Sequence, residues 1–192
     1  MLNQPEFIVQ LKQGEEVAFT KLVNDYEGMV YNTVLGILQV PADADDITQE
    51  VFIQVYRSIS SFKGESQFST WLYRIAINKA LDYEKTTKRK KRFAFIQSLF
   101  GKSDSSMTTV PDFNHPGVIL EKKQSSAALF AALKKIPEKQ RIAFTLHKLE
   151  GQSYRAVADI METTVIAVES LMARAKESLR KELKNFYQHE KY

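Results

Sequence analysis

The sequence predicts an all-α protein made of two small helical domains that are joined by an irregular linker, and three observations support this prediction. Apolar residues recur at helical spacing over long stretches, no sustained alternation of Val, Ile or Thr indicates a strand, and a stretch rich in Ser, Pro and Gly separates two helical regions. A chain of 192 residues with 44% hydrophobic content can bury a core in each domain.

The first domain is expected to contain three long amphipathic helices. Apolar residues at helical spacing predict two of them, over residues 19–37 and 47–59, with Pro41 between them. The third helix is expected after Ser69 and as far as about Thr86, because the FKGESQ before it is polar and contains Gly.

The composition changes between residues 97 and 117, where Ser, Pro and Gly replace the helical pattern and predict a linker. Helical spacing then returns, and Ser153 and Thr164 can cap two successive helices with a tight turn between them. This pattern is typical of a helix-turn-helix, although two packed helices of an ordinary bundle would also produce it. We therefore divide the chain into a first domain (1–94), a linker (95–124) and a second domain (125–192).

Several classes of function are not predicted. No apolar run approaches the length of a membrane span, and the N-terminus carries acids where a secretory signal would carry bases, so a cytoplasmic protein without membrane insertion is expected. The absence of Cys excludes disulfides, thiolate metal sites and a Cys nucleophile. His115, His147 and His189 are isolated from one another, and there is no glycine-rich phosphate loop. Neither catalysis nor a cofactor nor a metal is expected.

An acidic cluster opens the second helix, where residues 42–56 hold Asp43, Asp45, Asp46 and Glu50 and no base. The cluster could be a metal site, a solvated helix end in which Asp43 or Asp45 caps the helix, or a docking surface for a basic partner. The Gly turn and distal Glu of a calcium loop are missing, which argues against metal.

The third helix passes from an aromatic, apolar half into a cationic half. Helical steps from Arg74 reach Asn78 and then bases as far as Arg92, so one stripe could follow a DNA backbone, although a solvated helix end is the alternative. Trp71 and Leu72 could form part of the core, or Trp71 could stack on an unpaired base.

Four stretches in order resemble one family. They are similar to the extracytoplasmic-function group of bacterial sigma factors, the dissociable promoter-recognition subunits of RNA polymerase. The stretches are DADDITQEVFIQVYRSISSF, GESQFSTWLYRIAINKALDY, LKKIPEKQRIAFTLHKLEGQSYRAVADIM and AVESLMARAKESL. They resemble, in turn, the core-binding helix, the −10 and melting segment, the start of the fourth sigma domain and the −35 helix. The short linker has no room for the third sigma domain of housekeeping members, as is typical of this group.

The resemblance implies partners and site residues. The partners would be core RNA polymerase, through its β′ coiled coil and β flap, promoter DNA, and an anti-sigma factor; the chain itself would not be an enzyme. Core-polymerase binding is implied for Asp43, Asp46, Gln49, Glu50 and Phe52. Binding and melting of the −10 element are implied for Lys63, Ser66, Phe68, Ser69, Trp71, Arg74, Asn78, Lys79, Lys85, Lys88, Arg89 and Lys91. Binding of the −35 element is implied for Gln152, Ser153, Arg155, Val165, Ile166, Glu169, Ser170, Ala173 and Arg174.

The chain departs from the family pattern at three positions. Leu72 follows Trp71 where housekeeping members have a second Trp, Glu162 stands in the turn where many relatives have Gly, and Glu169 replaces a basic residue. A left-handed conformation at Glu162 would cost about 1 kcal/mol relative to Gly. An acid at position 169 can still accept a hydrogen bond from cytosine.

Two other classes of protein compete with the sigma-factor interpretation. An autonomous helix-turn-helix regulator would account for residues 153–183 but would leave residues 43–92 unexplained. A helical scaffold protein with basic ends would need neither polymerase nor salt-dependent DNA binding.

Overall fold

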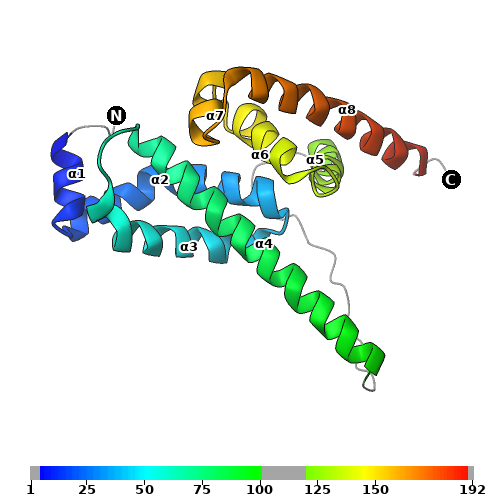
Figure 1. Ribbon diagram of the computed structural model, residues 1–192, viewed down its shortest axis with the longest axis horizontal. Coiled ribbons are helices and arrows are strands. Elements are labelled where there is room, and N and C mark those ends of the chain that lie inside the picture. Colours follow the sequence, from blue (N-terminus) through cyan, green and yellow to red (C-terminus); the bar gives the residue numbers. More distant parts are fainter. Residues whose placement is uncertain (1–4, 101–119, 190–192) are drawn as a thin grey trace.

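The computed structural model describes residues 5–100 and 120–189, with side chains described within residues 6–94 and 127–184. Every regular element in these ranges is helical, which confirms the predicted fold class. Figure 1 shows two groups of helices, with the second group lying beside the first half of the long helix α4. Within the described ranges, none of the helices combines the length and the apolar character needed to span a bilayer.

The first group begins with a short helix and contains three long ones. Its elements are α1 (Pro5–Lys12), α2 (Glu16–Leu38), α3 (Pro41–Ser58), the 3-10 turn η1 (Ile59–Ser61) and α4 (Phe68–Phe100). Helices α2, α3 and α4 contact one another in pairs and bury the apolar faces that the sequence predicts.

The start of α3 differs from the prediction that an Asp caps it. The N-cap is Val40, and Pro41 occupies the first turn, where its missing N–H costs no hydrogen bond. Asp43 lies in that first turn and accepts a hydrogen bond from the hydroxyl of Tyr83 on α4. The acid therefore joins two helices instead of capping one.

Helix α4 is longer than predicted. Its predicted end lies near Thr86, but the helix continues through the basic run to Phe100. Lys and Arg are good helix formers, and neither Pro nor Gly interrupts the chain before Gly101. The predicted linker therefore begins inside α4 and ends inside α5, and its central residues 101–119 lie outside the described part of the structure.

The second group contains the helix-turn-helix. Its elements are α5 (Leu120–Leu133), α6 (Glu138–Phe144), the π-helical turn η2 (Thr145–Leu149), α7 (Tyr154–Ile160) and α8 (Val165–His189). The two predicted caps are confirmed: Ser153 Oγ accepts from the Ala156 amide at 3.1 Å, and Thr164 Oγ1 accepts from the Ala167 amide at 3.2 Å. One face of α8 is buried at Val168, Met172, Ala175 and Leu179, and Leu171 is partly buried.

A single hydrophobic cluster extends through both groups, which the sequence pattern does not predict. Helix α2 contacts α5, α6 and η2, and α4 contacts α7. Gly36 of α2 packs tightly against the buried Thr145 of η2, whose hydroxyl donates to the Gly36 carbonyl at 3.2 Å. A smaller second cluster lies between α5 and α8.

Candidate nucleic-acid interface

Helix α3 presents a polar stripe to solvent. Asp46, Gln49 and Glu50 are exposed, whereas Ile47 and Val51 on the opposite face are buried in the core. This separation follows from the helical period, because residues three and four apart share a face. Of the other residues predicted to bind polymerase, Phe52 is partly buried and packs against the core, and Asp43 is turned toward Tyr83.

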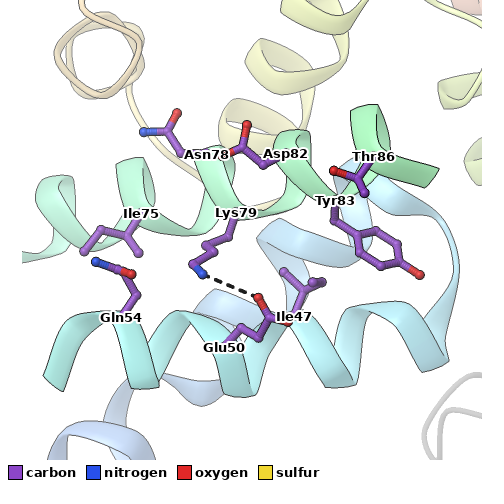
Figure 2. Close-up of a pocket in the computed structure, with 9 residues that line it drawn as sticks. All are labelled: Ile47, Glu50, Gln54, Ile75, Asn78, Lys79, Asp82, Tyr83 and Thr86. Atoms are coloured by element: carbon purple, nitrogen blue, oxygen red, sulfur yellow. Dashed lines mark hydrogen bonds and ion pairs between the residues drawn. The ribbon is translucent and has the colours of Figure 1, made fainter. Parts of the chain in front are cut away.

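A groove of about 570 Å³ lies between α3 and α4. Figure 2 shows Glu50 on α3 and Lys79 on α4 meeting across it, with Nζ and Oε2 3.4 Å apart. Asn78 lies one residue away on the side of α4 that points away from α3. The structure thus brings one predicted polymerase contact and one predicted DNA contact into a single ion pair.

The aromatic start of α4 differs from the prediction at Phe68. This side chain is only 1% exposed, and its ring lies 5.7 Å from that of Tyr26 and 5.6 Å from that of Phe62. The role of Phe68 in −10 binding is therefore corrected: a base could stack on it only if the domain opened. The loop before α4 returns the chain to α1 and η1 and thereby inserts this ring into the core.

Trp71 and Leu72 have different environments. Leu72 is fully buried, which confirms that it belongs to the core. Trp71 is partly exposed and packs on Phe62 and Phe68, with ring centroids 5.2 and 5.6 Å apart. Beside it, Lys63 is exposed, and Ser66 and Ser69 are partly exposed. Of the two aromatic residues predicted to bind the −10 element, Trp71 alone keeps surface that an unpaired base could reach.

The basic half of α4 is open to solvent. Its end projects beyond the rest of the bundle in Figure 1. The predicted stripe is exposed at Asn78, Lys85, Lys88, Arg89 and Arg92, and Lys91, also predicted to bind the −10 element, is exposed as well. Lys88 also pairs with Glu84, one turn earlier, at 3.0 Å.

Arg74 departs from that stripe and turns toward the second domain. Its Nη2 donates to the Asp159 carbonyl at 2.6 Å, and its Nη1 lies 3.1 Å from the Glu162 carboxylate. Gln152, predicted to contact −35 DNA, also turns toward the first domain and donates to the hydroxyl of Tyr73 at 3.0 Å.

The start of α8 presents an apolar tip. Ile166 is 78% exposed, Val165 is also exposed, and Glu169 and Ala173 continue the same open surface. Arg174 is exposed and donates to the partly exposed Ser170 at 2.8 Å. Ser153 and Arg155 are exposed on the preceding helix α7.

The turn before α8 contains the predicted left-handed residue. Glu162 has φ +52°, so the expected cost of about 1 kcal/mol relative to Gly applies. Its carboxylate is the group that pairs with Arg74. A residue that is unfavourable for the turn therefore makes a contact between the domains.

Sequence reasoning missed the charged pair that joins the domains. Arg141 on α6 is 3% exposed, and its Nη2 lies 2.7 Å from the Glu84 carboxylate on α4. Burial by itself would raise the pKa of Glu84, but hydrogen bonds from Lys88 and Arg141 and their charges outweigh burial, and the pKa is lowered. Glu84 and Arg141 are far apart in the sequence, so no local pattern predicts that they meet.

A second missed contact joins Tyr73 to Glu150. The Tyr73 hydroxyl donates to the Glu150 carboxylate at 3.2 Å. Burial raises the pKa of Glu150, although hydrogen bonds from Tyr73 and Asn32 act in the opposite direction. Burial, together with the Glu150 charge, also raises the pKa of Tyr73.

Parts of the two predicted DNA surfaces line the same groove. A polar groove of about 650 Å³ lies between the α4 entrance and the helix-turn-helix. Its lining includes Ser66 and Arg74 from the predicted −10 surface and Ser153 and Arg155 from the predicted −35 surface.

Comparison with known proteins finds two family matches in the same order. Residues 22–90 match the model described as Sigma-70 region 2, and residues 126–179 match Sigma-70, region 4. The chain is 32% identical over 179 residues to the ECF RNA polymerase sigma-E factor of Escherichia coli K12, covering 93% of each protein. It is 34% identical over 185 residues to that of Haemophilus influenzae, covering 95% of this chain and 96% of the relative.

Two solved structures share the fold. CnrH, in complex with the cytosolic domain of CnrY, matches with a TM-score of 0.65 and 22% identity, covering 93% of this chain and 96% of CnrH. The sigma factor RpoE of Bartonella quintana, in complex with the anti-sigma factor NepR, matches with a TM-score of 0.60 and 22% identity, covering 86% and 96%.

Proposed function

This chain belongs to the extracytoplasmic-function (ECF) family of RNA polymerase sigma factors, and from this membership we propose how its surfaces share the work of initiation. It is a transcription initiation factor that binds RNA polymerase and promoter DNA. The match of both sigma regions, in order, within relatives that align over 93% of the chain is the observation that carries this conclusion. Sigma factors are transcription factors, and we assign this chain no catalysis of its own.

We assign core-polymerase binding and −10 recognition to residues 1–94 and −35 recognition to residues 125–192, with residues 95–124 joining them. The polymerase contact is the exposed stripe Asp46, Gln49 and Glu50 of α3. An exposed acidic stripe suits a basic partner, and the β′ coiled coil of polymerase is the partner that the family implies. The β flap is the partner that the family implies for the second domain.

The −10 surface is assigned to the exposed residues of α4 and the loop before it. Trp71 supplies an aromatic face for an unpaired base, and Asn78 supplies an amide for a base edge. The bases from Lys85 onward hold the DNA backbone. Because Leu72 follows Trp71 where housekeeping members have a second Trp, we expect this surface to tolerate fewer promoter mismatches.

The −35 surface is assigned to the start of α8. Val165 and Ile166 are exposed apolar groups that suit the thymine methyl in the major groove, and Glu169 suits the cytosine amino group. Ser153, Arg155 and Arg174 are exposed where they can reach phosphates. An anti-sigma partner is also proposed, because the related fold of RpoE was solved with the anti-sigma factor NepR.

The experiment that tests the proposal is co-elution with bacterial core polymerase in size exclusion. Wild type should co-elute, whereas Asp46→Lys with Glu50→Lys should weaken the complex without changing helix content. Glu15→Lys, at the N-cap of α2, with Glu27→Lys, on that helix, makes the same charge change at exposed positions and should leave the complex intact. Failure of wild type to co-elute would favour an autonomous DNA-binding regulator or a scaffold, and equal binding by both double variants would remove the docking assignment.

A further inference from the structure

A cavity of about 490 Å³ lies between α1 and the loop before α4, and the proposed function does not assign it. Residues from both elements form its lining, which includes Ile8, Lys12, Phe62, Lys63, Ser66 and Gln67. The match to Sigma-70 region 2 covers residues 22–90, so α1 lies outside it. A helix beyond the matched segment therefore packs against the loop to which −10 recognition is assigned.

Lys12 fixes the start of that loop. Its ammonium donates a hydrogen bond to the Phe62 carbonyl at 2.8 Å. A hydrogen bond from a charged donor is stronger than one between neutral groups. The neighbouring Leu11 is fully buried, so the helix that carries the ammonium is itself anchored in the core. Within the loop, Gly64 adopts φ +76°, a conformation that favours Gly and lets the chain turn. The position of the loop therefore depends on α1 as well as on the loop's own sequence.

The chemistry of the lining suits one nucleotide of an unpaired strand. Among the described residues, the lining contains two cations, Lys12 and Lys63, and no acid, which suits a phosphate. Ile8 is partly exposed and offers an apolar wall, while the exposed amide of Gln67, next to Ser66, can bond to the edge of a base. Ligand sites of about 300–1,000 Å³ combine apolar walls with a few polar groups, and this cavity lies within that range.

Phe62 connects the cavity to the proposed −10 surface. Its carbonyl accepts from Lys12, and its ring lies 5.2 Å from the ring of Trp71, which is proposed to meet an unpaired base. The Phe62 side chain is 7% exposed, so it supports both neighbours from within the core. Because a single side chain separates Trp71 from the cavity, a strand that meets Trp71 can place an adjacent nucleotide against α1.

We propose that α1 completes a nucleotide-binding subsite of the −10 surface, in which Lys12 positions the loop and Ile8 forms a wall for the base. This inference rests on the proposed −10 function and adds to it a helix outside the matched region. Lys12 acts through the Phe62 carbonyl and is therefore a positioning residue. Its loss should change which base is accepted, whereas the loss of a cation that only attracts phosphates would weaken binding to all bases alike.

Lys12→Met tests the positioning role, because it keeps the aliphatic stem and removes the donor. Lys21→Met removes the same charge from an exposed position on α2 and is the matched control. The assay measures binding of the polymerase complex to a premelted promoter fragment, selected from random duplexes, with each of the four bases placed in turn at each unpaired position. At one position, wild type and Lys21→Met should prefer one base by about fivefold, and Lys12→Met should show no preference. Lys12→Arg keeps a donor and should restore the preference. Equal preferences in Lys12→Met and Lys21→Met would overturn the proposal.

Ile8→Trp tests the cavity itself, because the larger side chain fills it. Val9→Trp introduces the same ring at an exposed neighbour outside the lining. Ile8→Trp should weaken binding to the premelted promoter by at least about fivefold, the lower end of what one held base contributes. Its co-elution with core polymerase should stay intact. Equal DNA binding by the two Trp variants would overturn the proposal. Weaker co-elution of Ile8→Trp alone would also overturn it, since polymerase would then occupy the cavity.

Trp71→Ala in the same assay separates two failures. If Trp71→Ala weakens binding to the premelted promoter while the Lys12 and Ile8 variants bind as their controls do, only the subsite at α1 fails. If Trp71→Ala and the α1 variants all bind like wild type, the −10 assignment of this surface fails as well.

Discussion

Phe68 supports the first domain from its centre. Its ring packs against Tyr26, Phe62 and Trp71, which come from α2, from the loop after η1 and from its own helix. Aromatic rings of this size bury large apolar areas, and edge-to-face contacts between them stabilise the folded domain further. Trp71, the residue proposed to meet an unpaired base, rests on this cluster and takes its orientation from it.

We therefore expect Phe68→Ala to lower the free energy of unfolding by about 3–5 kcal/mol, because it leaves a cavity in a closed aromatic cluster. Phe93→Ala makes the same change on the same helix at a side chain that is 68% exposed, and should alter stability by no more than about 0.5 kcal/mol. Urea unfolding followed by circular dichroism measures both. Similar losses in the two variants would show that Phe68 is not a core residue.

Glu150 should make stability depend on pH. Burial raises its pKa in the folded protein, so its contribution is complete below the unfolded value of 4.5 and is lost as pH rises through the raised pKa. Glu84 behaves in the opposite way. Its pKa is lowered in the folded protein, so its contribution to stability is complete above pH 4.5 and is lost as pH falls through the lowered pKa. Glu150→Gln should therefore flatten the fall in stability above pH 4.5 and raise stability at neutral pH, as measured by urea unfolding at several pH values. If Glu150→Gln left the pH dependence of the free energy of unfolding unchanged, Glu150 would not be the group that causes it.

At the scale of the element, α4 divides into a packed half and a free half. The first half contributes buried residues such as Leu72, Ala76 and Ala80 to the core. The second half carries the basic run, which is exposed and has few packing contacts. A rigid helix that leaves the bundle with its charges in solvent is suited to an extended anion, and this is why the backbone contacts are assigned here.

Neutralising Lys88, Arg89 and Lys91 to Ala should weaken binding of the polymerase complex to promoter DNA and make it less sensitive to salt. The slope of log affinity against log salt should become shallower by about 0.9 for each phosphate contact that is lost. Lys134, Lys135 and Lys139 are exposed bases of the second domain, and neutralising them changes the net charge equally. Filter binding at several salt concentrations, with a promoter fragment selected from random duplexes, should show a change of slope for the first set alone.

At the scale of the whole molecule, the ion pair between Arg141 and Glu84 connects α6 to α4. Arg141→Ala should lower stability by about 2 kcal/mol, because it leaves a partly buried carboxylate with only Lys88 beside it. Lys135→Ala breaks the exposed pair with Glu182 and should cost less than about 1 kcal/mol. Calorimetry should show a lower melting temperature for Arg141→Ala alone. Equal melting temperatures for Arg141→Ala and Lys135→Ala would show that the Arg141–Glu84 pair does not hold the domains together.

The sequence by itself determined the helical class, both caps of the helix-turn-helix and the exposed stripes. The helical spacing of apolar residues and the caps at Ser153 and Thr164 depend only on neighbours within one or two turns of helix. The local sequence pattern is therefore enough to predict them. Phe68 was predicted wrongly because burial depends on where a loop returns the chain, which the helical period does not encode. The tertiary structure alone decided that Arg74 faces Glu162 and that Thr145 packs on Gly36. These residues are far apart in sequence, and their contact requires that two complete domains pack together.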